Sequence, residues 1–470
     1  MNHQIVDLYH RMPPSVRSVI ASGFGYYLRW ARYGMQPGRA VNEILRQEAW
    51  SPDEIRRYQA LRLAHILDRA ATRVPYYRAL WKARRRLGDA SSWMELENWT
   101  VLEKDTVRAR QQELVADDCN LRALHHSTTS GSTGTPVHLW VSRKNLRTWY
   151  ALHEARTRAW YGVSRRDRWA ILGGQLIIPP ESRTPPFWVW NAALHQLYLS
   201  VYHISAETIP LYLDALVRYR VRYLLGYTTA LYQIANYVLT SGSACIPMQV
   251  VVTNAEPLSL HQRRVISSVF QCPVRETYGM SELAVMASEC EHGTLHLWPT
   301  VGIVEVIRDG RHVPPGETGD LICTGLLNDD MPLIRYRTGD RGALAPPGQT
   351  CPCGRTLPIL ARVEGRHDDL IHTTDGRALT GLDAVFADGV PVREGQLIQE
   401  DLQTIRLRFV PAEGYSPQHG EAMVDYLKRR IGEVNIVLEV MDRIPRGPNG
   451  KFRAQVSRVH PPAGSVAHVP

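Results

Sequence analysis

Between residues 222 and 270 the sequence alternates between two patterns, and this alternation constrains the fold most strongly. Residues 222–226 and 248–253 are short apolar runs typical of strands, whereas residues 229–239 and 260–270 have the apolar spacing of helices. Strands that alternate with helices of this length indicate an α/β sheet. We therefore predict an α/β protein in which ligands bind at the loops that follow the strands.

One such loop is expected at residues 276–282, after a short apolar strand candidate at residues 272–275. The loop contains an aromatic ring at Tyr278, a flexible glycine at Gly279 and a carboxylate at Glu282. This combination can flank a purine and hold a divalent cation. An ordinary turn has a similar composition, so the segment alone leaves both interpretations open.

Residues 126–136 form a second candidate loop, because most of them are serine, threonine or glycine. The backbone N–H groups of such a loop can form an anion-binding nest, and its hydroxyl groups add donors for phosphate oxygens. It is not a Walker motif, since no Gly-Lys-Ser or Gly-Lys-Thr closes it. A flexible linker is the alternative, but a predicted strand at residues 137–141 follows at once, which favours phosphate binding.

Two polar segments in the C-terminal half carry further candidates. Within residues 335–340 the carboxylate of Asp340 follows a glycine turn and can accept two hydrogen bonds from a ribose diol, although a capped turn explains the same pattern. Residues 446–453 form a glycine-flanked basic loop. Such a loop can carry Lys451 to a distant anion, whereas a solvated loop is the commoner meaning of this composition.

The order of these patterns predicts four regions. Residues 1–120 are expected to be a helical part of the large domain, with Ser51 as a helix N-cap, and residues 121–365 to be its nucleotide-binding core with a β-rich subdomain. After a glycine joint at Gly365, residues 366–455 are expected to form a small, mobile α+β domain, and residues 456–470 a disordered tail.

Four of the potential metal ligands are arranged as two pairs, Cys290 with His296 and Cys351 with Cys353. The chain has seven cysteines, an odd number that argues against a disulfide framework. Thiolates and an imidazole are the soft tetrahedral ligand set that Zn²⁺ prefers, and four protein ligands indicate a structural rather than a catalytic zinc. The alternative is a group of buried thiol and imidazole side chains without metal.

The formal net charge of +9 over 470 residues can attract nucleic acid, an anionic membrane or nucleotides. Arginine runs such as residues 84–86 are typical of solvated helix faces, so we expect no nucleic-acid partner. No apolar stretch reaches the length of about 18 to 20 residues that a membrane span needs. We expect a cytoplasmic enzyme, with residues 15–34 as the less favoured alternative of a peripheral membrane contact.

Taken in chain order, these segments resemble the adenylate-forming superfamily of acyl-CoA synthetases and adenylation enzymes. Within it the chain is similar to the phenylacetate-CoA ligase branch, and in that branch to the capsular-polysaccharide-associated members. The resemblance extends from about Arg62 to Arg453. It rests on residues 74–77, 129–136, 255–257, 278–282, 336–340 and 365–366, and on residues 446–453, the lysine loop.

The resemblance implies a role for each matched residue. The β- and γ-phosphates of ATP would be held by Thr129, Ser130, Gly131, Ser132, Thr133 and Gly134. The adenine would be bordered by Ala255, Glu256, Tyr278 and Gly279, and the ribose held by Asp340. The catalytic residues would be Glu282, which binds Mg²⁺, Arg366, which contacts the nucleotide, and Lys451, which reaches the carboxylate and the α-phosphate; Asp368 would be the hinge. In this branch the matching Cys-His-Cys-Cys positions carry zinc.

We therefore expect an ATP- and Mg²⁺-dependent ligase that forms an acyl-adenylate, releases pyrophosphate and transfers the acyl group to CoA. An aryl or arylacetic acid is the favoured substrate, with Tyr150, Gly226 and Tyr227 as pocket walls. The alternatives are transfer to an amino sugar, an amino acid or a carrier protein in polysaccharide or natural-product biosynthesis, and a nucleotide-binding homologue without turnover. Thr135 departs from the lysine of many superfamily members, and no CoA signature is present.

Overall fold

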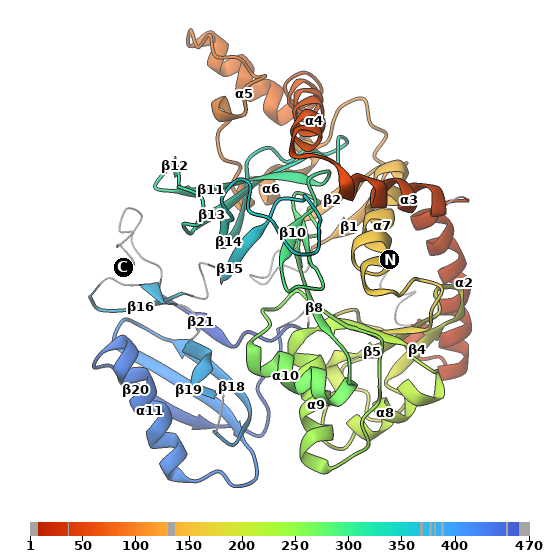
Figure 1. Cartoon of the computed structure of the whole chain (residues 1–470), viewed down its shortest axis with the longest axis vertical. Helices are drawn as coiled ribbons and strands as arrows, with labels where there is room; N and C mark the ends of the chain where they lie inside the picture. Colours follow the sequence, from red (N-terminus) through yellow and green to blue (C-terminus); the bar gives the residue numbers. More distant parts are fainter. Residues whose placement is uncertain are drawn as a thin grey trace.

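The computed structural model consists of an eight-stranded mixed sheet, a five-stranded antiparallel sheet and a smaller C-terminal sheet with one long helix (Figure 1). It confirms the predicted α/β fold. The residues it describes are 8–35, 37–129, 137–366, 370–375, 378–379, 382–386, 390–447 and 450–459. Among these residues, no helix is both long enough and apolar enough to cross a membrane.

The N-terminal region is helical, as predicted. It contains α2 (Pro14–Tyr33), α3 (Pro37–Arg46), α4 (Pro52–Arg73), α5 (Pro75–Arg86) and α6 (Lys104–Arg110), with short 3₁₀ turns between them. Ser51 and Glu54 form a capping box at the start of α4, in which the backbone N–H of Glu54 donates to the Ser51 hydroxyl at 3.2 Å. Pro75 then begins α5, because proline fits the first turn of a new helix.

The eight-stranded sheet has the order β10-β9-β8-β7-β6-β3-β5-β4. Its strands are β3 (Trp169–Gly173), β4 (Trp188–Asn191), β5 (Gln196–Ser200), β6 (Tyr223–Tyr227), β7 (Val251–Asn254), β8 (Val274–Gly279), β9 (Met286–Glu289) and β10 (Leu295–Leu297). The central strands β5, β3, β6, β7 and β8 run parallel. Their apolar side chains pack with α8 (Ile209–Arg218), α9 (Thr228–Ser241) and α10 (Leu260–Phe270) into the main hydrophobic core.

One predicted boundary in this sheet is wrong. Residues 276–279 are strand rather than loop, because β8 continues through Gly279 and pairs there with β9. Only the stretch from Met280 onward leaves the sheet. Gly279 fits this pairing since a Cβ at its position would lie 2.1 Å from Sδ of Met286.

The five-stranded sheet has the order β12-β11-β13-β14-β15. Its strands are β11 (Gly302–Arg308), β12 (Arg311–His312), β13 (Gly319–Gly325), β14 (Tyr336–Leu344) and β15 (Leu360–Arg366). Asp340 lies inside β14, not in a capped turn, although Gly339 before it has a φ of +83° where the pairing of β13 with β14 is irregular. The hairpin of β1 (His125–Thr128) and β2 (His138–Val141) and the helix α7 (Arg143–Arg156) precede the eight-stranded sheet in the chain.

The C-terminal part has a core of its own, with Leu407, Phe409 and Leu427 fully buried. It contains β16 (Ile371–His372), β17 (Ala378–Leu379), β18 (Val392–Gln399), β19 (Thr404–Pro411), α11 (Pro417–Ile431), β20 (Asn435–Val440) and β21 (Gln455–Ser457). The expectation of disorder from residue 456 is wrong at its start, because Val456 and Ser457 belong to β21, which pairs parallel with β18. Residues 460–470 lie outside the described residues.

Candidate active site and metal centre

Three parallel strands of the eight-stranded sheet end at one edge and place candidate residues there. Tyr227 ends β6, Ala255 and Glu256 follow β7, and Tyr278 lies near the end of β8. This edge is where α/β sheets bind ligands. Ala255 has a φ of +64°, a left-handed conformation that is uncommon for a residue with a side chain and is concentrated at functional sites.

Tyr278 connects this edge to the five-stranded sheet. Its hydroxyl donates to Oδ2 of Asp340 at 2.9 Å, and Nε of Arg366 lies 3.4 Å from Oδ1 of the same carboxylate. Burial raises the pKa of Asp340, and the Arg366 guanidinium opposes this rise. Burial also raises the pKa of Tyr278, so its hydroxyl stays protonated and can donate. Three residues singled out from separate segments of the sequence therefore form one polar cluster.

Glu282 is buried beside this cluster. The hydroxyl of Tyr336 donates to its Oε1 at 3.3 Å, and Nζ of Lys104 lies 3.9 Å from the same oxygen. Burial lowers the pKa of Lys104, and Glu282 opposes the decrease. The sequence analysis did not single out Lys104. A signal was present, because Lys104 is the first residue of α6 and a cation is disfavoured at a helix N-terminus unless something else requires it.

Lys451 reaches this region from the C-terminal part. Its Nζ lies 5.9 Å from the centre of the Tyr227 ring. Burial lowers the pKa of Lys451, and Arg366 lowers it further, while the carboxylates of Glu256, Asp340 and Glu282 raise it. The fold thus brings together a lysine near the end of the chain and carboxylates from two sheets of the large domain.

The side-chain carboxylate of Glu256 holds the lysine loop by accepting a hydrogen bond from the backbone of the loop. The backbone N–H of Phe452 donates to Oε1 of Glu256 at 2.8 Å, while the other oxygen accepts from the Thr229 backbone N–H at 2.8 Å and from the Thr229 hydroxyl at 2.7 Å. Burial raises the pKa of Glu256, and these backbone hydrogen bonds oppose the rise. Residue Glu256 was predicted to border adenine; its observed contacts fix Phe452, next to Lys451.

Polar contacts flank this loop and join the C-terminal part to the eight-stranded sheet. Arg446, whose side chain is 9% exposed, lies 3.1 Å from Glu394 and stacks over the Phe452 ring at 4.5 Å. The amide of Gln233 on α9 also donates to Glu394. Arg443 donates to the Tyr202 carbonyl at 3.1 Å. Directional hydrogen bonds therefore help to fix the loop, beside the packing of Gly450 against Val201 and Tyr202.

Of the predicted phosphate ligands, only Thr129 is among the described residues; the start of the predicted loop is wrong, because residues 126–128 belong to strand β1. The backbone N–H of Thr129 donates to the Val137 carbonyl at 2.9 Å, and its hydroxyl accepts from the Val137 backbone N–H at 3.1 Å. These bonds join the two ends of the loop. The other predicted phosphate ligands, Ser130, Gly131, Ser132, Thr133 and Gly134, lie outside the described residues, as do Thr135 and the predicted hinge residue Asp368.

The three residues predicted for the acid pocket lie in two places. Tyr227 stands beside Lys451, and Gly226 precedes it on β6, where a Cβ would lie 2.6 Å from the backbone oxygen of Leu172. Strand packing therefore requires glycine at position 226. Tyr150 lies on α7, where its ring contacts Tyr33 of α2 edge-on at 5.6 Å and Arg32 stacks over it at 4.7 Å.

The predicted metal ligands converge on one point. The ligand atoms of Cys290, His296, Cys351 and Cys353 all lie within 4.8 Å of one another. Sγ of Cys353 is 3.3 Å from Nε2 of His296, and Sγ of Cys290 is 3.6 Å from Sγ of Cys351. Nδ1 of His296 faces the Leu357 carbonyl at 3.3 Å, which leaves Nε2 for a metal ion. This donor set fits tetrahedral zinc.

The chain is similar to several known proteins. Residues 375–458 match the model of the CapK C-terminal domain family. The chain is 25% identical to Protein CapK of Staphylococcus aureus over 398 residues, which are 82% of this chain and 85% of that protein. It is 24% identical to the phenylacetate-coenzyme A ligase of Escherichia coli K12 over 354 residues, or 69% of this chain and 74% of that protein.

Among solved structures, 2-hydroxyisobutyryl-CoA ligase in its post-adenylation state superposes with a TM-score of 0.68 at 17% identity, covering 88% of this chain and 91% of that chain. In its thioesterification state, with the same coverage, the TM-score is 0.52. These relatives and neighbours confirm the predicted resemblance: the chain is a homologue of CapK and of the phenylacetate-CoA ligases and has the fold of adenylate-forming CoA ligases.

Proposed function

We propose that this protein is an ATP-dependent carboxylate ligase that joins a carboxylic acid to AMP, releases pyrophosphate and then passes the acyl group to a nucleophile. The observation that carries the proposal is the position of Lys451: it lies half-buried, 5.9 Å from the Tyr227 ring at the end of β6, in a loop that the Glu256 carboxylate holds through Phe452. A non-catalytic nucleotide-binding homologue has no need for a lysine delivered from a separate domain to that position.

The proposed reaction explains why charged side chains gather at the candidate active site. A carboxylate oxygen of the acid attacks the α-phosphorus of ATP, a new C–O–P linkage forms, and the bond to the pyrophosphate oxygen breaks. The attack brings anions together, so positioning and charge neutralisation supply most of the rate acceleration. Lys451 provides a compact cation for the carboxylate and the α-phosphate, and Asp340 provides acceptors for the ribose hydroxyls.

Lys104 supplies a second cation in this proposal. It lies 3.9 Å from Glu282, on the large domain, and so stays in place if the C-terminal domain moves. Many superfamily members carry a lysine in the phosphate loop where this chain has Thr135. We assign to Lys104 part of the neutralisation that such a lysine provides.

Two metal ions are part of the proposal. A buried carboxylate at Glu282, together with ATP phosphates, suits Mg²⁺, which usually binds one or two carboxylates and keeps oxygen ligands from substrate and water. Zn²⁺ at Cys290, His296, Cys351 and Cys353 would link the β9–β10 hairpin to the segment before β15. Because all four donors are protein side chains, that zinc would stabilise the fold and take no part in the reaction.

The C-terminal domain is proposed to rotate after adenylation, withdrawing Lys451 so that the acyl acceptor can enter. The hydrogen bonds through Glu256, Glu394 and Tyr202 suit a contact that forms and breaks, because polar contacts can exchange partners with water at small net cost. CoA is the default acceptor. The second candidate is transfer to an amine or a carrier protein in polysaccharide or natural-product biosynthesis.

The decisive experiment is acid-dependent exchange of labelled pyrophosphate into ATP without any acceptor, over a panel of aryl, arylacetic, fatty and amino acids. We expect exchange with an aryl or arylacetic acid. Exchange only with fatty or amino acids would reject the substrate class and keep the reaction type. No exchange, in protein that binds ATP, would reject adenylation of these acids. Single-turnover transfer to CoA, or to a panel of amines, then identifies the acceptor.

A further inference from the structure

Helix α2 is attached to the molecule along one side only. It runs along the outer edge of the structure beside β4 (Figure 1). The Asn191 amide donates to the Ala21 carbonyl at 2.9 Å, and the Ala192 backbone N–H donates to the Ser22 hydroxyl at 3.0 Å. Gly25 packs so closely that a Cβ there would lie 2.1 Å from Oδ1 of Asn191. The attached side is therefore a well-fitted one.

The opposite side of α2 is apolar and exposed. Its large apolar side chains recur every three or four residues, which places them in one stripe along the helix. They are 40% to 71% exposed, and they are Val16, Val19, Ile20, Phe24, Tyr27 and Trp30. Of these side chains, Trp30 lies under the guanidinium groups of Arg143 and Arg147 of α7, and all six remain at least 40% exposed within the described part of the chain. A contiguous apolar stripe of this size marks an interaction surface.

The charge around this stripe has one sign. Helix α2 contains no acidic residue; of its three arginines, Arg29 is exposed, whereas Arg17 is buried and Arg32 lies over the Tyr150 ring. From α7, the guanidinium groups of Arg143 and Arg147 lie 4.4 Å and 5.6 Å from the centre of the exposed Trp30 ring. Lys144 beside them is also exposed. An apolar stripe with aromatic rings and a cationic border is complementary to an anionic lipid surface, where tyrosine and tryptophan settle at headgroup depth.

Two other occupants fit less well. A second copy of the chain, related by a two-fold axis, would bring arginine-bordered stripes together and place like charges against each other. Insertion across a bilayer does not fit either, because α2 is not apolar enough to span one. A helix that lies in the plane of the interface satisfies both the stripe and the charges.

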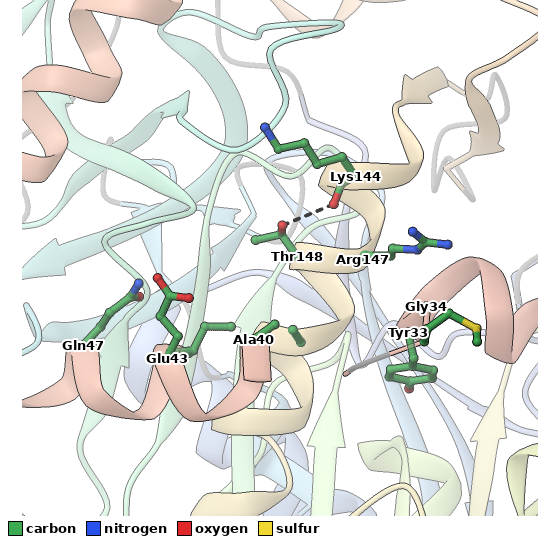
Figure 2. A pocket seen from close by; sticks show the side chains of 11 residues that line it. Tyr33, Gly34, Ala40, Glu43, Gln47, Lys144, Arg147 and Thr148 are labelled. Atoms are coloured by element: carbon green, nitrogen blue, oxygen red, sulfur yellow. Dashed lines mark hydrogen bonds between the residues drawn. The ribbon is translucent and has the colours of Figure 1, made fainter. Parts of the chain in front are cut away.

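We propose that α2 binds the surface of an anionic phospholipid bilayer, with its Val16 to Trp30 stripe among the acyl chains and the cationic side chains of Arg143, Lys144 and Arg147 at the headgroup phosphates. A cavity of about 540 Å³ lies next to the end of α2; its lining includes Tyr33, Glu43 of α3, and Lys144 and Arg147 of α7 (Figure 2). Arg147 belongs to both the cationic border and the cavity wall.

The test is flotation of the full chain with vesicles of phosphatidylcholine, and of phosphatidylcholine mixed with phosphatidylglycerol. We expect the protein to float with the mixed vesicles and to remain at the bottom with phosphatidylcholine alone. The double variant Val19→Glu, Phe24→Glu is expected to lower partitioning about tenfold or more. Leu61→Glu, at an exposed leucine of α4, is the matched control and should not change it.

Arg143→Glu provides an independent variant outside α2, and it is expected to lower binding to mixed vesicles about fivefold. Absence of wild-type flotation, or equal losses in the double variant and in Leu61→Glu, would overturn the proposal. Sedimentation velocity tests the alternative that a second copy of the chain binds the stripe. A wild-type dimer that does not float, and that the double variant converts to monomer, would assign the stripe to a second copy of the chain.

Discussion

Two regions of this molecule join segments that are far apart in the sequence, and they do so in different ways. The Cys/His cluster connects the β9–β10 hairpin to the segment before β15 through four donor atoms within 4.8 Å of one another. The lysine loop connects the C-terminal part to the eight-stranded sheet through hydrogen bonds such as that from Phe452 to Glu256, 2.8 Å long. One arrangement suits a permanent link, the other a link that breaks.

The chemistry of the side chains accounts for the difference. Thiolates and an imidazole around a metal are a closed set, in which removal of one ligand weakens the whole. Hydrogen bonds between backbone, carboxylate and guanidinium groups can each be replaced by bonds to water. We infer that the cluster holds the large domain together, whereas the loop contact makes Lys451 available for one half-reaction only. Substitutions in the two regions should therefore affect different measurements.

The largest effect is expected for Lys451→Ala. Loss of a preorganised cation from a site of charge development should slow adenylation about 10²- to 10³-fold. ATP binding should remain close to wild type. The reaction of preformed acyl-adenylate with the acceptor should also remain close to wild type, because Lys451 has left the site before that half-reaction. Single-turnover measurement of both half-reactions provides the check. Equal loss in both would contradict the assignment and would remove the distinction between a breakable and a permanent link.

Cys351→Ser should have the next largest effect, and on stability instead of chemistry. Loss of one of four donors should lower zinc content and destabilise the protein by about 3 kcal/mol or more. Metal analysis and thermal unfolding measure both. Cys323→Ser is the matched control, since Cys323 is also a buried thiol but lies outside the cluster. A Cys351→Ser protein that retains full zinc would exclude Cys351 as a ligand.

Local patterns predicted the elements better than they predicted the contacts between them. The helix expected at residues 260–270 is α10, because its apolar spacing and the Ser259 N-cap are local signals. The extent of β8 was wrong, since pairing with β9 decides it and that pairing depends on residues further along the chain. Lys104 was missed for the same reason: its importance comes from the position of Glu282, a long way off in the sequence.

At the candidate active site too, the residues could be predicted from the sequence better than the contacts between them. Tyr278, Asp340 and Arg366 were singled out by residue type, and the structure brings them into contact, but their predicted roles toward a nucleotide stay predictions. The contact between Glu256 and Phe452 could not be predicted, because a backbone N–H donor exists at nearly every residue and has no sequence signature. The cysteine and histidine pairs were found because few residue types bind zinc.

The variant Glu256→Gln tests whether the contact between Glu256 and the lysine loop limits the rate of adenylation. The carboxylate accepts from both Thr229 and Phe452, and an amide can present only one oxygen, so one donor loses its partner. We expect adenylation to slow about tenfold, in line with the cost of about 1–3 kcal/mol for an unpaired buried donor. Transfer from preformed acyl-adenylate should not change. Thr229→Val, which leaves the Phe452 bond intact, should have the smaller effect; the reverse order would show that the loop contact does not limit adenylation.

The smallest expected effect is a shift in the pH dependence of adenylation. Burial lowers the pKa of Lys451 from the ordinary lysine value of 10.5, and Arg366 lowers it further. The charged form is the active one, so the rate should fall as pH rises through this lowered pKa, earlier than an exposed lysine would allow. The docked state binds fewer protons at Lys451, so by linkage docking strengthens over the same pH range, and undocking cannot explain the loss of rate.

The variant Lys451→Arg tests whether the alkaline decrease in rate comes from deprotonation of Lys451 or from another group. A guanidinium stays charged throughout the range, so the variant should be slower at neutral pH but should lose the alkaline decrease in rate. Pre-steady-state adenylation rates between neutral and alkaline pH measure both curves. If wild type and Lys451→Arg decline at the same pH, the decline belongs to another group. The loop contact would then still deliver Lys451, but its burial would have no bearing on the pH at which the enzyme works.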